Sequence, residues 1–344
     1  MPHGTSSQAA DGASSRALKT LSYPCRNGLI FAATNELREY GTMIEDQSLS
    51  EIAVPPRRRA LLIVNTHARR GAAAEQQAAV ALAAAGFHVD RRNCPKRDDM
   101  TALIRSAGHD VDCVVIGGGD GTLNAAAPAL LETGLPLGVI PLGTANDLAR
   151  TLNIPVDPAQ AVEIIAKGHV RRIDLGMAND HPFFNVASIG FGVDLTRALT
   201  RDAKSRWGTL GYAVAGFHVL SRMRPFRARI TQDGNTIVSK TVHLSIGNGR
   251  HYGGGMTVSE DAAIDDGRLS IYSLEVQSVW KLLLLLPAMR KGTHGRWKEV
   301  MTLAGREIIV GTHRPRSVNT DGEITTKTPV RFKVLAGAIG IYAP

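Results

Sequence analysis

The 344-residue sequence has few cysteines, and their number and spacing exclude some classes of protein. Cys25, Cys94 and Cys113 are odd in number and lie far apart, and the sequence has no C-x-x-C pair and no histidine pair at metal-ligand spacing. These features argue against a structural zinc site and are typical of reduced thiols in a cytoplasmic compartment.

The sequence also has no long apolar segment. Its longest strongly apolar run, Leu282–Leu286, is followed by Pro287 and is far too short to span a bilayer. No N-terminal stretch has the charged, apolar and cleavage regions of a signal peptide. We therefore expect a cytoplasmic protein. Its net charge of +9 favours anionic partners, namely nucleotide phosphates, nucleic acid or an acidic membrane surface.

The chain changes character twice. Residues 1–57 are rich in Ser, Ala, Gly and Thr, lack sustained periodicity and indicate a poorly ordered N-terminal extension. Residues 58–174 alternate buried-strand and helix patterns, which predicts a doubly wound α/β domain with a parallel sheet. Residues 175–329 contain short β-type runs separated by Asp-Gly and Gly-Asn turns, which predicts an antiparallel β-sandwich with one helical insertion near 208–221.

Within the α/β domain, the pattern places a ligand at the carboxyl ends of the strands. The strands are expected at Arg59–Asn65, 87–92, Val111–Ile116 and Leu135–Leu142, and the helices at Ala72–Gly86, Arg97–Gly108, Leu123–Leu131 and Pro158–Lys167.

The stretch CVVIGGGDGTLN places four glycines around Asp120, directly after an apolar strand pattern. Glycine at this density destabilises regular structure, so the bare backbone must have a use, and a strand-to-helix turn that binds phosphate is the commonest one. A tight turn without a ligand stays open as the alternative. There is no P-loop, and Thr122 occupies the position of the third glycine of G-x-G-x-x-G. Asp120 suits a magnesium ion or a hydroxyl that loses its proton.

Several further stretches occur in a fixed order: PLGTANDLAR, IDLG, FNVASIGFGVD, GNGRHYGGGM, DAAIDDGRLSIY and NTDGE. Together with GGGDGTLN they resemble the diacylglycerol kinase catalytic-domain superfamily in its bacterial lipid kinase branch, to which sphingosine and ceramide kinases are also similar. The resemblance implies ATP-dependent phosphorylation of a lipid hydroxyl, with diacylglycerol as the first acceptor to consider. It also implies an NAD kinase-like and diacylglycerol kinase-like α/β domain, completed by a C-terminal strand within about 330–344, with the nucleotide between this domain and the sandwich.

The resemblance assigns nucleotide contacts to the glycine turn, to the loop after the first strand and to the GTAND segment. In that loop, His67, Arg69 and Arg70 depart from the small polar residues that many members carry. The implied nucleotide-binding residues are Asn65, Gly71, Gly117, Gly118, Gly119, Asp120, Gly121, Thr122, Asn124 and Thr144.

Four carboxylates are implied to be catalytic. Glu323 of NTDGE matches the general base, and Asp120 and Asp147 match carboxylates that support the active site. Asp174 of IDLG matches a carboxylate and water network that organises catalytic magnesium. The simpler alternatives are a helix N-cap for Asp147, a surface turn for Asp174 and an ordinary exposed carboxylate for Glu323.

A second, structural Mg²⁺ is implied in DAAIDDGRL. The matching ligands are the main-chain carbonyls of Ala263 and Arg268 and the carboxylate of Asp266, an all-oxygen set that suits magnesium. A solvated loop is the alternative.

Two segments, Arg201–Arg229 and Val279–Lys298, mix Arg and Lys with Trp207, Trp280 and Trp297. This mixture favours peripheral, transient docking on an anionic bilayer surface; the alternative is helices packed on the sandwich with a solvated basic face. No nucleic-acid-binding motif accompanies the charge, so we expect a lipid substrate and no nucleic acid. The sequence leaves a homodimer open.

Two rival functions stay open. One is a soluble kinase similar to NAD kinase, which also carries a GGDGT turn; the other is a nucleotide-binding regulatory protein without turnover.

Overall fold

The computed structural model describes residues 58–64, 71–94, 96, 99–190, 224–259, 262–276 and 278–344. The chain divides into two units, Met1–Pro55 and Pro56–Pro344, and all described residues belong to the second. The predicted extension at 1–57 and the predicted helical insertion at 208–221 lie outside the described residues.

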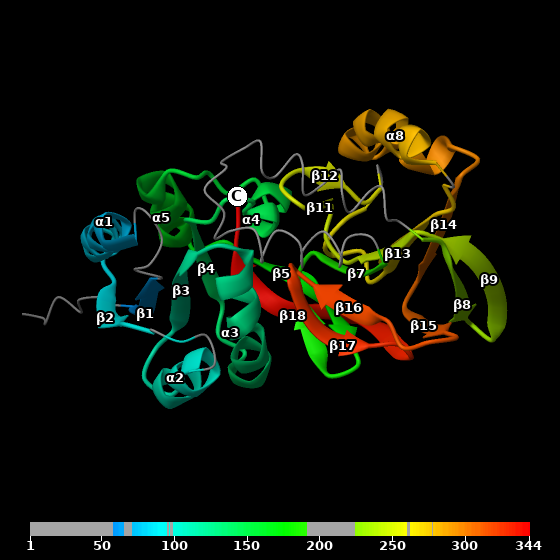
Figure 1. Ribbon diagram of the computed structural model, residues 1–344. Helices are drawn as coiled ribbons and strands as arrows, with labels where there is room; N and C mark the ends of the chain where they lie inside the picture. Colours follow the sequence, from blue (N-terminus) through cyan, green and yellow to red (C-terminus); the bar gives the residue numbers. More distant parts are fainter. Residues whose placement is uncertain are drawn as a thin grey trace, which may run out of the picture. The chain divides into compact units, whose positions relative to one another are not determined.

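The first half of the second unit alternates strands and helices (Figure 1). Strand β3 pairs in parallel with β1 on one side and with β4 on the other, and β2 extends the sheet in parallel beside β1. Helices α1 and α5 cover one face of this sheet, and α2 and α3 cover the other. The elements are β1 (Arg59–Val64), α1 (Gly71–Ala84), β2 (His88–Arg92), α2 (Met100–Ala107), β3 (Cys113–Gly118), α3 (Asp120–Thr133), β4 (Leu137–Pro141), α4 (Asp147–Thr151) and α5 (Pro158–Lys167).

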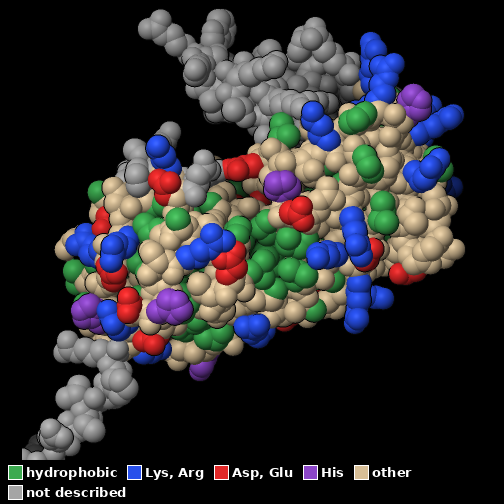
Figure 2. All heavy atoms as spheres, turned by 90° about the horizontal axis from the view of Figure 1, so that it is seen from below, with side chains coloured by type: hydrophobic (Ala, Val, Ile, Leu, Met, Phe, Trp, Pro, Cys, Tyr) green, Lys and Arg blue, Asp and Glu red, His purple; other side chains and the backbone are tan. Residues whose placement is uncertain are grey.

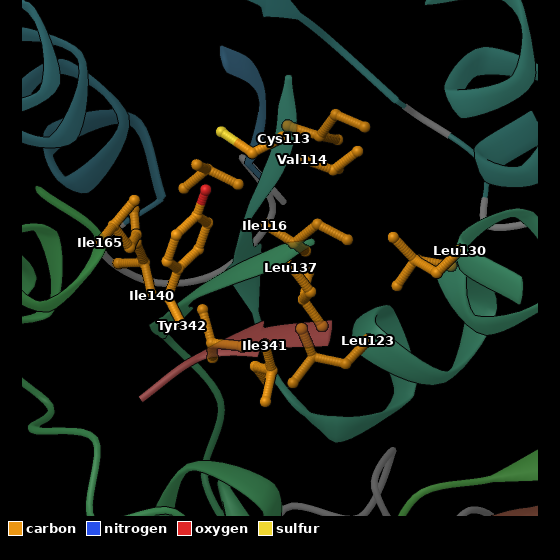
Figure 3. Packing of buried hydrophobic residues seen from close by; sticks show 14 of the residues in the cluster. Cys113, Val114, Ile116, Leu123, Leu130, Leu137, Ile140, Ile165, Ile341 and Tyr342 are labelled. Atoms are coloured by element: carbon orange, nitrogen blue, oxygen red, sulfur yellow. The ribbon is translucent and has the colours of Figure 1, made fainter. Parts of the chain in front are cut away.

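The core of this half lies on both faces of β3 and β4 (Figure 3). Leu123 and Leu130 of α3 pack on one side of the strands, and Ile165 of α5 packs on the other beside Ile140. Because both faces are covered, the strands are apolar throughout, as parallel strands usually are. Helix α5 begins with Asp157, whose side chain accepts the N–H of Gln160 (3.0 Å), a standard N-cap.

The second half is built of antiparallel strands. A six-stranded sheet has the order β14-β13-β10-β7-β16-β17 and packs on strands of the larger sheet to form the sandwich core. The elements are β5 (Val170–Ala178), β6 (His181–Phe183), β7 (Val186–Gly190), β8 (Phe226–Gln232), β9 (Asn235–Thr241), β10 (His243–Gly247), β11 (His251–Tyr252), β12 (Met256–Thr257), β13 (Leu269–Leu274), α8 (Val279–Lys291), the 3₁₀ helix η2 (Thr293–Arg296), β14 (Val300–Gly305), β15 (Glu307–Thr312), β16 (Ser317–Thr320), β17 (Glu323–Lys327) and β18 (Val330–Tyr342).

One long strand, β18, belongs to both halves. Its C-terminal part pairs in parallel with β4 at Ile341, and its N-terminal part pairs antiparallel with β15. It also follows β5 over most of its length, with a shift of register between Leu335 and Ile339 around Gly337, whose φ is +55°. The parallel strands and half of the sandwich therefore form one continuous ten-stranded sheet.

This architecture confirms the predicted fold class, an α/β half with a parallel sheet and an antiparallel β half. Most of the predicted element bounds differ from the observed ones by one to three residues, and two of these differences affect the glycine turn. Strand β3 runs two residues further than predicted because its pairing with β4 continues through Gly117 and Gly118. Helix α3 begins at Asp120 and not at Leu123. None of the described helices is long and apolar enough to cross a membrane.

Gly176 of the IDLG segment is required by packing. A Cβ atom at this position would lie 2.2 Å from Cζ of Phe183, its cross-strand neighbour. We expect Gly176→Ala to lower the free energy of unfolding by about 1–3 kcal/mol, because the buried ring must move. Denaturant unfolding measures the change. Gly311→Ala is the control, since no heavy atom lies within 4 Å of its added Cβ. Equal stability of the two variants would contradict the packing argument.

Candidate active site

Two glycine turns meet at the carboxyl ends of β3 and β4. A Cβ atom on Gly143 would lie 2.5 Å from Cα of Gly119, so the two main chains are in direct contact. Asn146, at a left-handed φ of +49°, closes the second turn because its side chain both accepts from and donates to the main chain of Gly143. Close backbone approach is therefore one use of the bare backbone.

The glycine turn after β3 exposes fewer main-chain N–H groups than the sequence indicated. Gly117 and Gly118 are strand residues paired with β4, and the N–H of Thr122 donates to the carbonyl of Gly119 (2.9 Å). The buried Thr122 side chain lies directly over Gly118. A phosphate cradle at this turn would therefore begin at Gly119 and use the first turn of α3, where Asp120 and Gly121 stand and where helical N–H groups lack intrahelical partners.

Asp120 joins three segments of the chain. Its Oδ1 accepts the N–H of Leu148 at the start of α4 (3.1 Å) and the side-chain N–H of Asn185 (3.4 Å). Asn185 lies between β6 and β7, in the other half of the molecule. The carboxylate is half-buried. Asp120 is thus held at the junction of the two halves, and its Oδ2 has no hydrogen-bond partner among the described residues.

Asp147 makes contacts that its sequence context did not predict. The N-cap of α4 is Asn146, and Asp147 is the first residue of the helix. Its carboxylate accepts the main-chain N–H groups of Gly254 (3.0 and 3.1 Å) and Gly255 (3.1 Å) in the turn between β11 and β12. Burial raises the pKa of Asp147, the negative charge of Asp120 adds to this, and the Gly254 N–H opposes it. The N-cap alternative for Asp147 is wrong. Its carboxylate instead clamps the YGGGM turn, that is, it binds the main chain of Gly254 and Gly255.

Asp321, in the Asp-Gly turn of the NTDGE segment, accepts more hydrogen bonds than the other carboxylates of the site. Its carboxylate accepts three successive main-chain N–H groups, from Phe184 (2.7 Å), Asn185 (3.0 Å) and Val186 (3.0 Å). The side chain of Asn124 on α3 donates to it as well (2.9 Å). Burial raises the pKa of Asp321 to about 6, against the four donors, which favour the ionised form. No local signal separates this aspartate from one in an ordinary Asp-Gly turn.

Glu323, the predicted base, opens strand β17 and is paired across the hairpin with Thr320. Its side chain is exposed. Only Gly322 separates it from Asp321, so the position of this predicted base depends on the position of the Asp321 carboxylate.

The other predicted nucleotide contacts differ in their surroundings. The side-chain amide of Asn124 donates two hydrogen bonds to protein partners, one to the carboxylate of Asp321 and one to the carbonyl of Pro182 (3.1 Å). Thr144 is exposed at the carboxyl end of β4. Gly71 is buried at the first position of α1, and Asn65 lies outside the described residues.

Asp174 is buried and is bound by main chain on both oxygens. Oδ2 accepts the N–H of Gly267 (2.6 Å), and Oδ1 accepts the N–H of Gly337 in the irregular part of β18 (2.7 Å). The surface-turn alternative is therefore wrong, since Asp174 is 2 % exposed on β5. Its main-chain carbonyl is linked to that of Phe184 through the side chain of Asn248, which donates to both.

The predicted magnesium ligands Ala263, Asp266 and Arg268 share the turn that precedes β13. Asp266 accepts the N–H of Arg268 (2.8 Å), and burial raises its pKa against hydrogen bonds from the main chain of Arg268 and Ala263. In the part of the chain that the structure describes, no three His, Cys, Asp or Glu side chains gather as metal ligands. A cation here would therefore depend on main-chain carbonyls, as the resemblance implies, with Asp266 as the single carboxylate.

Two buried amide oxygens lie near Asp120 and Asp174: Oδ1 of Asn185, whose side-chain N–H bonds Asp120, and Oδ1 of Asn248, whose side-chain N–H bonds the carbonyl of Asp174. Neither oxygen has a hydrogen-bond partner among the described residues. Unpartnered oxygens are costly to bury, and they suit a bound water or the water shell of a divalent cation. With the carboxylate of Asp120 adjacent, the donor set fits hydrated magnesium.

Comparisons with known proteins show the family and the fold of the chain. Residues 59–178 match the model of the diacylglycerol kinase catalytic domain, and residues 187–343 match that of the YegS C-terminal NAD kinase beta sandwich-like domain. Diacylglycerol kinases of Staphylococcus aureus strains JH9 and Newman are each 30 % identical over 268 residues, which covers 77 % of this chain and 85 % of theirs. The crystal structure of a proposed diacylglycerol kinase from Bacillus anthracis strain Sterne is 26 % identical with a TM-score of 0.70, and covers 84 % of this chain and 98 % of its own.

The two matched family models and the relatives define the class of protein as a kinase with an α/β domain and a β-sandwich domain. The chain belongs to the diacylglycerol kinase family, as its sequence motifs predicted.

Asp147 provides a test of the contact between α4 and the YGGGM turn. We expect Asp147→Ala to lower the free energy of unfolding by about 1–2 kcal/mol, because two main-chain N–H groups lose their acceptor. Hydrogen exchange at Gly254 and Gly255 should become faster at the same time. Asp180→Ala, an exposed position in the β5–β6 turn, serves as the control. Unchanged exchange at both glycines would show that the clamp does not hold the turn.

Proposed function

We propose that this kinase transfers the γ-phosphoryl group of ATP to a lipid hydroxyl, with diacylglycerol as the first acceptor to test. The observation that carries the proposal is the hydrogen-bonded link from Asp120 through Asn185 to Asp321, which joins the start of α3 to the hairpin that bears Glu323. Phosphoryl transfer depends mainly on positioning and charge neutralisation, and this link supplies the positioning.

Each residue then has a defined part. The first turn of α3, from Gly119 onward, holds phosphate oxygens by its N–H groups, and Thr144 contributes a hydroxyl from the neighbouring turn. Glu323 takes the proton of the lipid hydroxyl as the lipid oxygen bonds to the γ-phosphorus. The bond between the γ-phosphorus and its bridging oxygen breaks, and ADP leaves with the electron pair.

Magnesium, when bound, supplies neutralisation of the phosphate charge. Asp120 is the carboxylate suited to a nucleotide-bound ion. Asp266, with the carbonyls of Ala263 and Arg268, is suited to a second, structural ion, which would brace the turn that Asp174 also binds through Gly267.

The central experiment measures transfer of label from ATP to diacylglycerol, other lipid alcohols and NAD in anionic mixed micelles, with Asp120→Ala as the control for the site. Label in a lipid product supports the proposal. Label in NADP alone would replace it with a soluble NAD kinase, and ATP consumption without a phosphorylated acceptor would refute it.

Glu323 provides a sharper test. We expect Glu323→Gln to lower kcat by about 10²–10⁴ while the protein stays folded, because the amide cannot accept the hydroxyl proton. Glu307→Gln on β15 is the matched control: Glu307 is paired with Arg331 on the surface (2.7 Å), away from the hairpin. Near-normal turnover of the Glu323→Gln variant would remove Glu323 from the role of base.

We also propose that the outer face of α8 docks on an anionic bilayer. Leu282, Leu285 and Met289 face the sandwich and are buried. On the outside, Trp280 is 73 % exposed and Leu284 is 67 % exposed, one helical turn apart. Apolar side chains with cations at their border suit an interface of anionic headgroups. The exposed cations of this region are Arg290, Lys291, Arg296, Lys298 and Lys281, the last of which pairs with Glu299 (2.6 Å).

The position of α8 relates this surface to the site. Thr257 of β12 donates its hydroxyl to the carbonyl of Arg290 (3.1 Å), and β12 closes the turn that Asp147 clamps. On the face of the molecule that Figure 2 shows, acidic and basic side chains are mixed over the α/β half, whereas basic ones predominate over the sandwich half. That face lies opposite α8, which is at the top of Figure 1, so the docking proposal rests on the exposed side chains of α8 and its neighbours and not on this distribution of charge.

The double substitution Trp280→Ser with Leu284→Ser tests the docking face. We expect weaker sedimentation with phosphatidylglycerol vesicles and lower activity on vesicle-borne substrate, with unchanged activity on a short-chain, water-soluble diacylglycerol. Val80→Ser on α1, where the side chain is 58 % exposed, is the control. Vesicle binding equal to that of the control would exclude α8 as the docking element.

A further inference from the structure

Two hairpins of the sandwich share the same turn chemistry. Asp233–Gly234 joins β8 to β9, and Asp321–Gly322 joins β16 to β17. Both aspartates have left-handed backbone conformations, with φ of +50° and +47°, and both glycines have positive φ. Asp-Gly and Asn-Gly are the usual sequences for such turns, so the turn itself needs no carboxylate.

The two carboxylates have different surroundings. That of Asp233 accepts from the side chain of its neighbour Gln232 (3.3 Å). That of Asp321 accepts four N–H donors, and none of them comes from its own hairpin. The β16–β17 turn is instead closed by Asn319, whose side chain accepts the N–H of Gly322 (2.9 Å). The Asp321 carboxylate thus fastens the hairpin to the rest of the molecule.

The attachment points are elements of the site. Asn185 donates its main-chain N–H to Asp321 and its side-chain N–H to Asp120, so one residue fixes the spacing of two carboxylates. Asn124 reaches Asp321 from α3, the helix whose first residue is Asp120. These hydrogen bonds therefore fix the position of the hairpin relative to both helix α3 and the start of strand β7.

We infer that Asp321 is a positioning residue for the phosphoryl transfer proposed above: with Asn124 and Asn185 it forms a latch that fixes the Glu323 hairpin relative to Asp120. The inference rests on the proposed function for its kinetic consequence, and on the hydrogen bonds alone for its structural one. The four groups that donate to the Asp321 carboxylate all belong to the protein, so the role inferred for it is to position Glu323 and not to take part in the chemistry.

The energetics support a role other than stability. Burial raises the pKa of Asp321 to about 6, so the ionised form that accepts four donors is held at neutral pH against a desolvation cost. An asparagine would keep the turn conformation without that cost, but its NH₂ group would face N–H donors. A carboxylate is the side chain of this size that can accept all four.

The test compares Asp321→Asn with Asp233→Asn, the same substitution in the same kind of turn. For Asp321→Asn we expect kcat to fall by about 10- to 100-fold, the loss that a misplacement of about 1 Å can cause, with little change in KM for ATP. Hydrogen–deuterium exchange should become faster in residues 317–327 and stay unchanged in residues 113–141, which shows that the fold is intact. Asp233→Asn should change neither the rate nor the exchange of residues 317–327. Asn124→Ala, which removes one donor, should give a smaller effect in the same direction and replaces Asp321→Asn if that variant does not fold.

The two proposals fail differently. If the wild type phosphorylates a lipid and Asp321→Asn has the kcat of Asp233→Asn, the latch is overturned and the function stands. If the wild type phosphorylates no lipid, the proposed function fails, and the exchange experiment still decides the latch: equal exchange of residues 317–327 in both Asn variants overturns it.

Discussion

Carboxylates that accept main-chain N–H groups from segments far away in the sequence are the contacts on which the site depends. Asp147 on α4 binds the turn between β11 and β12 in this way. Asp321 on the sandwich hairpin accepts main-chain N–H groups from the β6–β7 connection and, from the α/β side, the side-chain N–H of Asn124. Main-chain donors cannot rotate away as side chains can, so each such bond fixes an element and not just a residue. Burial raises the pKa of both carboxyl groups, because their ionised forms lose hydration in the folded protein.

The fold and the family were predictable because their signals are local. The apolar run of β3, its glycines and the helix pattern after them predicted a strand-to-helix turn, and the order of the motifs identified the family. The fold class follows from periodicity alone, and the bounds of α5 agree with the sequence at both ends because its cap residues, Asp157 and Gly168, are explicit.

The hydrogen-bond partners within the site were not predictable in the same way. Asp147 has the sequence of a helix cap, and only the approach of Gly254, more than a hundred residues later, gives it another partner. Asp321 has the sequence of a turn, and its donors lie in a strand connection far earlier in the chain. Such contacts depend on the tertiary arrangement, for which one sequence provides no local signal. Gly119 shows the converse: its sequence context suggested ligand binding, and the structure adds a close contact of its backbone with that of Gly143.

The pairing of strand β18 with both halves has a consequence for folding during synthesis. Because it pairs with β4 on one side of its bend and with β15 on the other, neither half can complete its sheet before residues 330–342 have left the ribosome. Until then the parallel strands have an open edge at β4, and the sandwich lacks one of its inner strands. The nascent chain must therefore keep two incomplete sheets from pairing with other chains, and both are closed together by the same late segment.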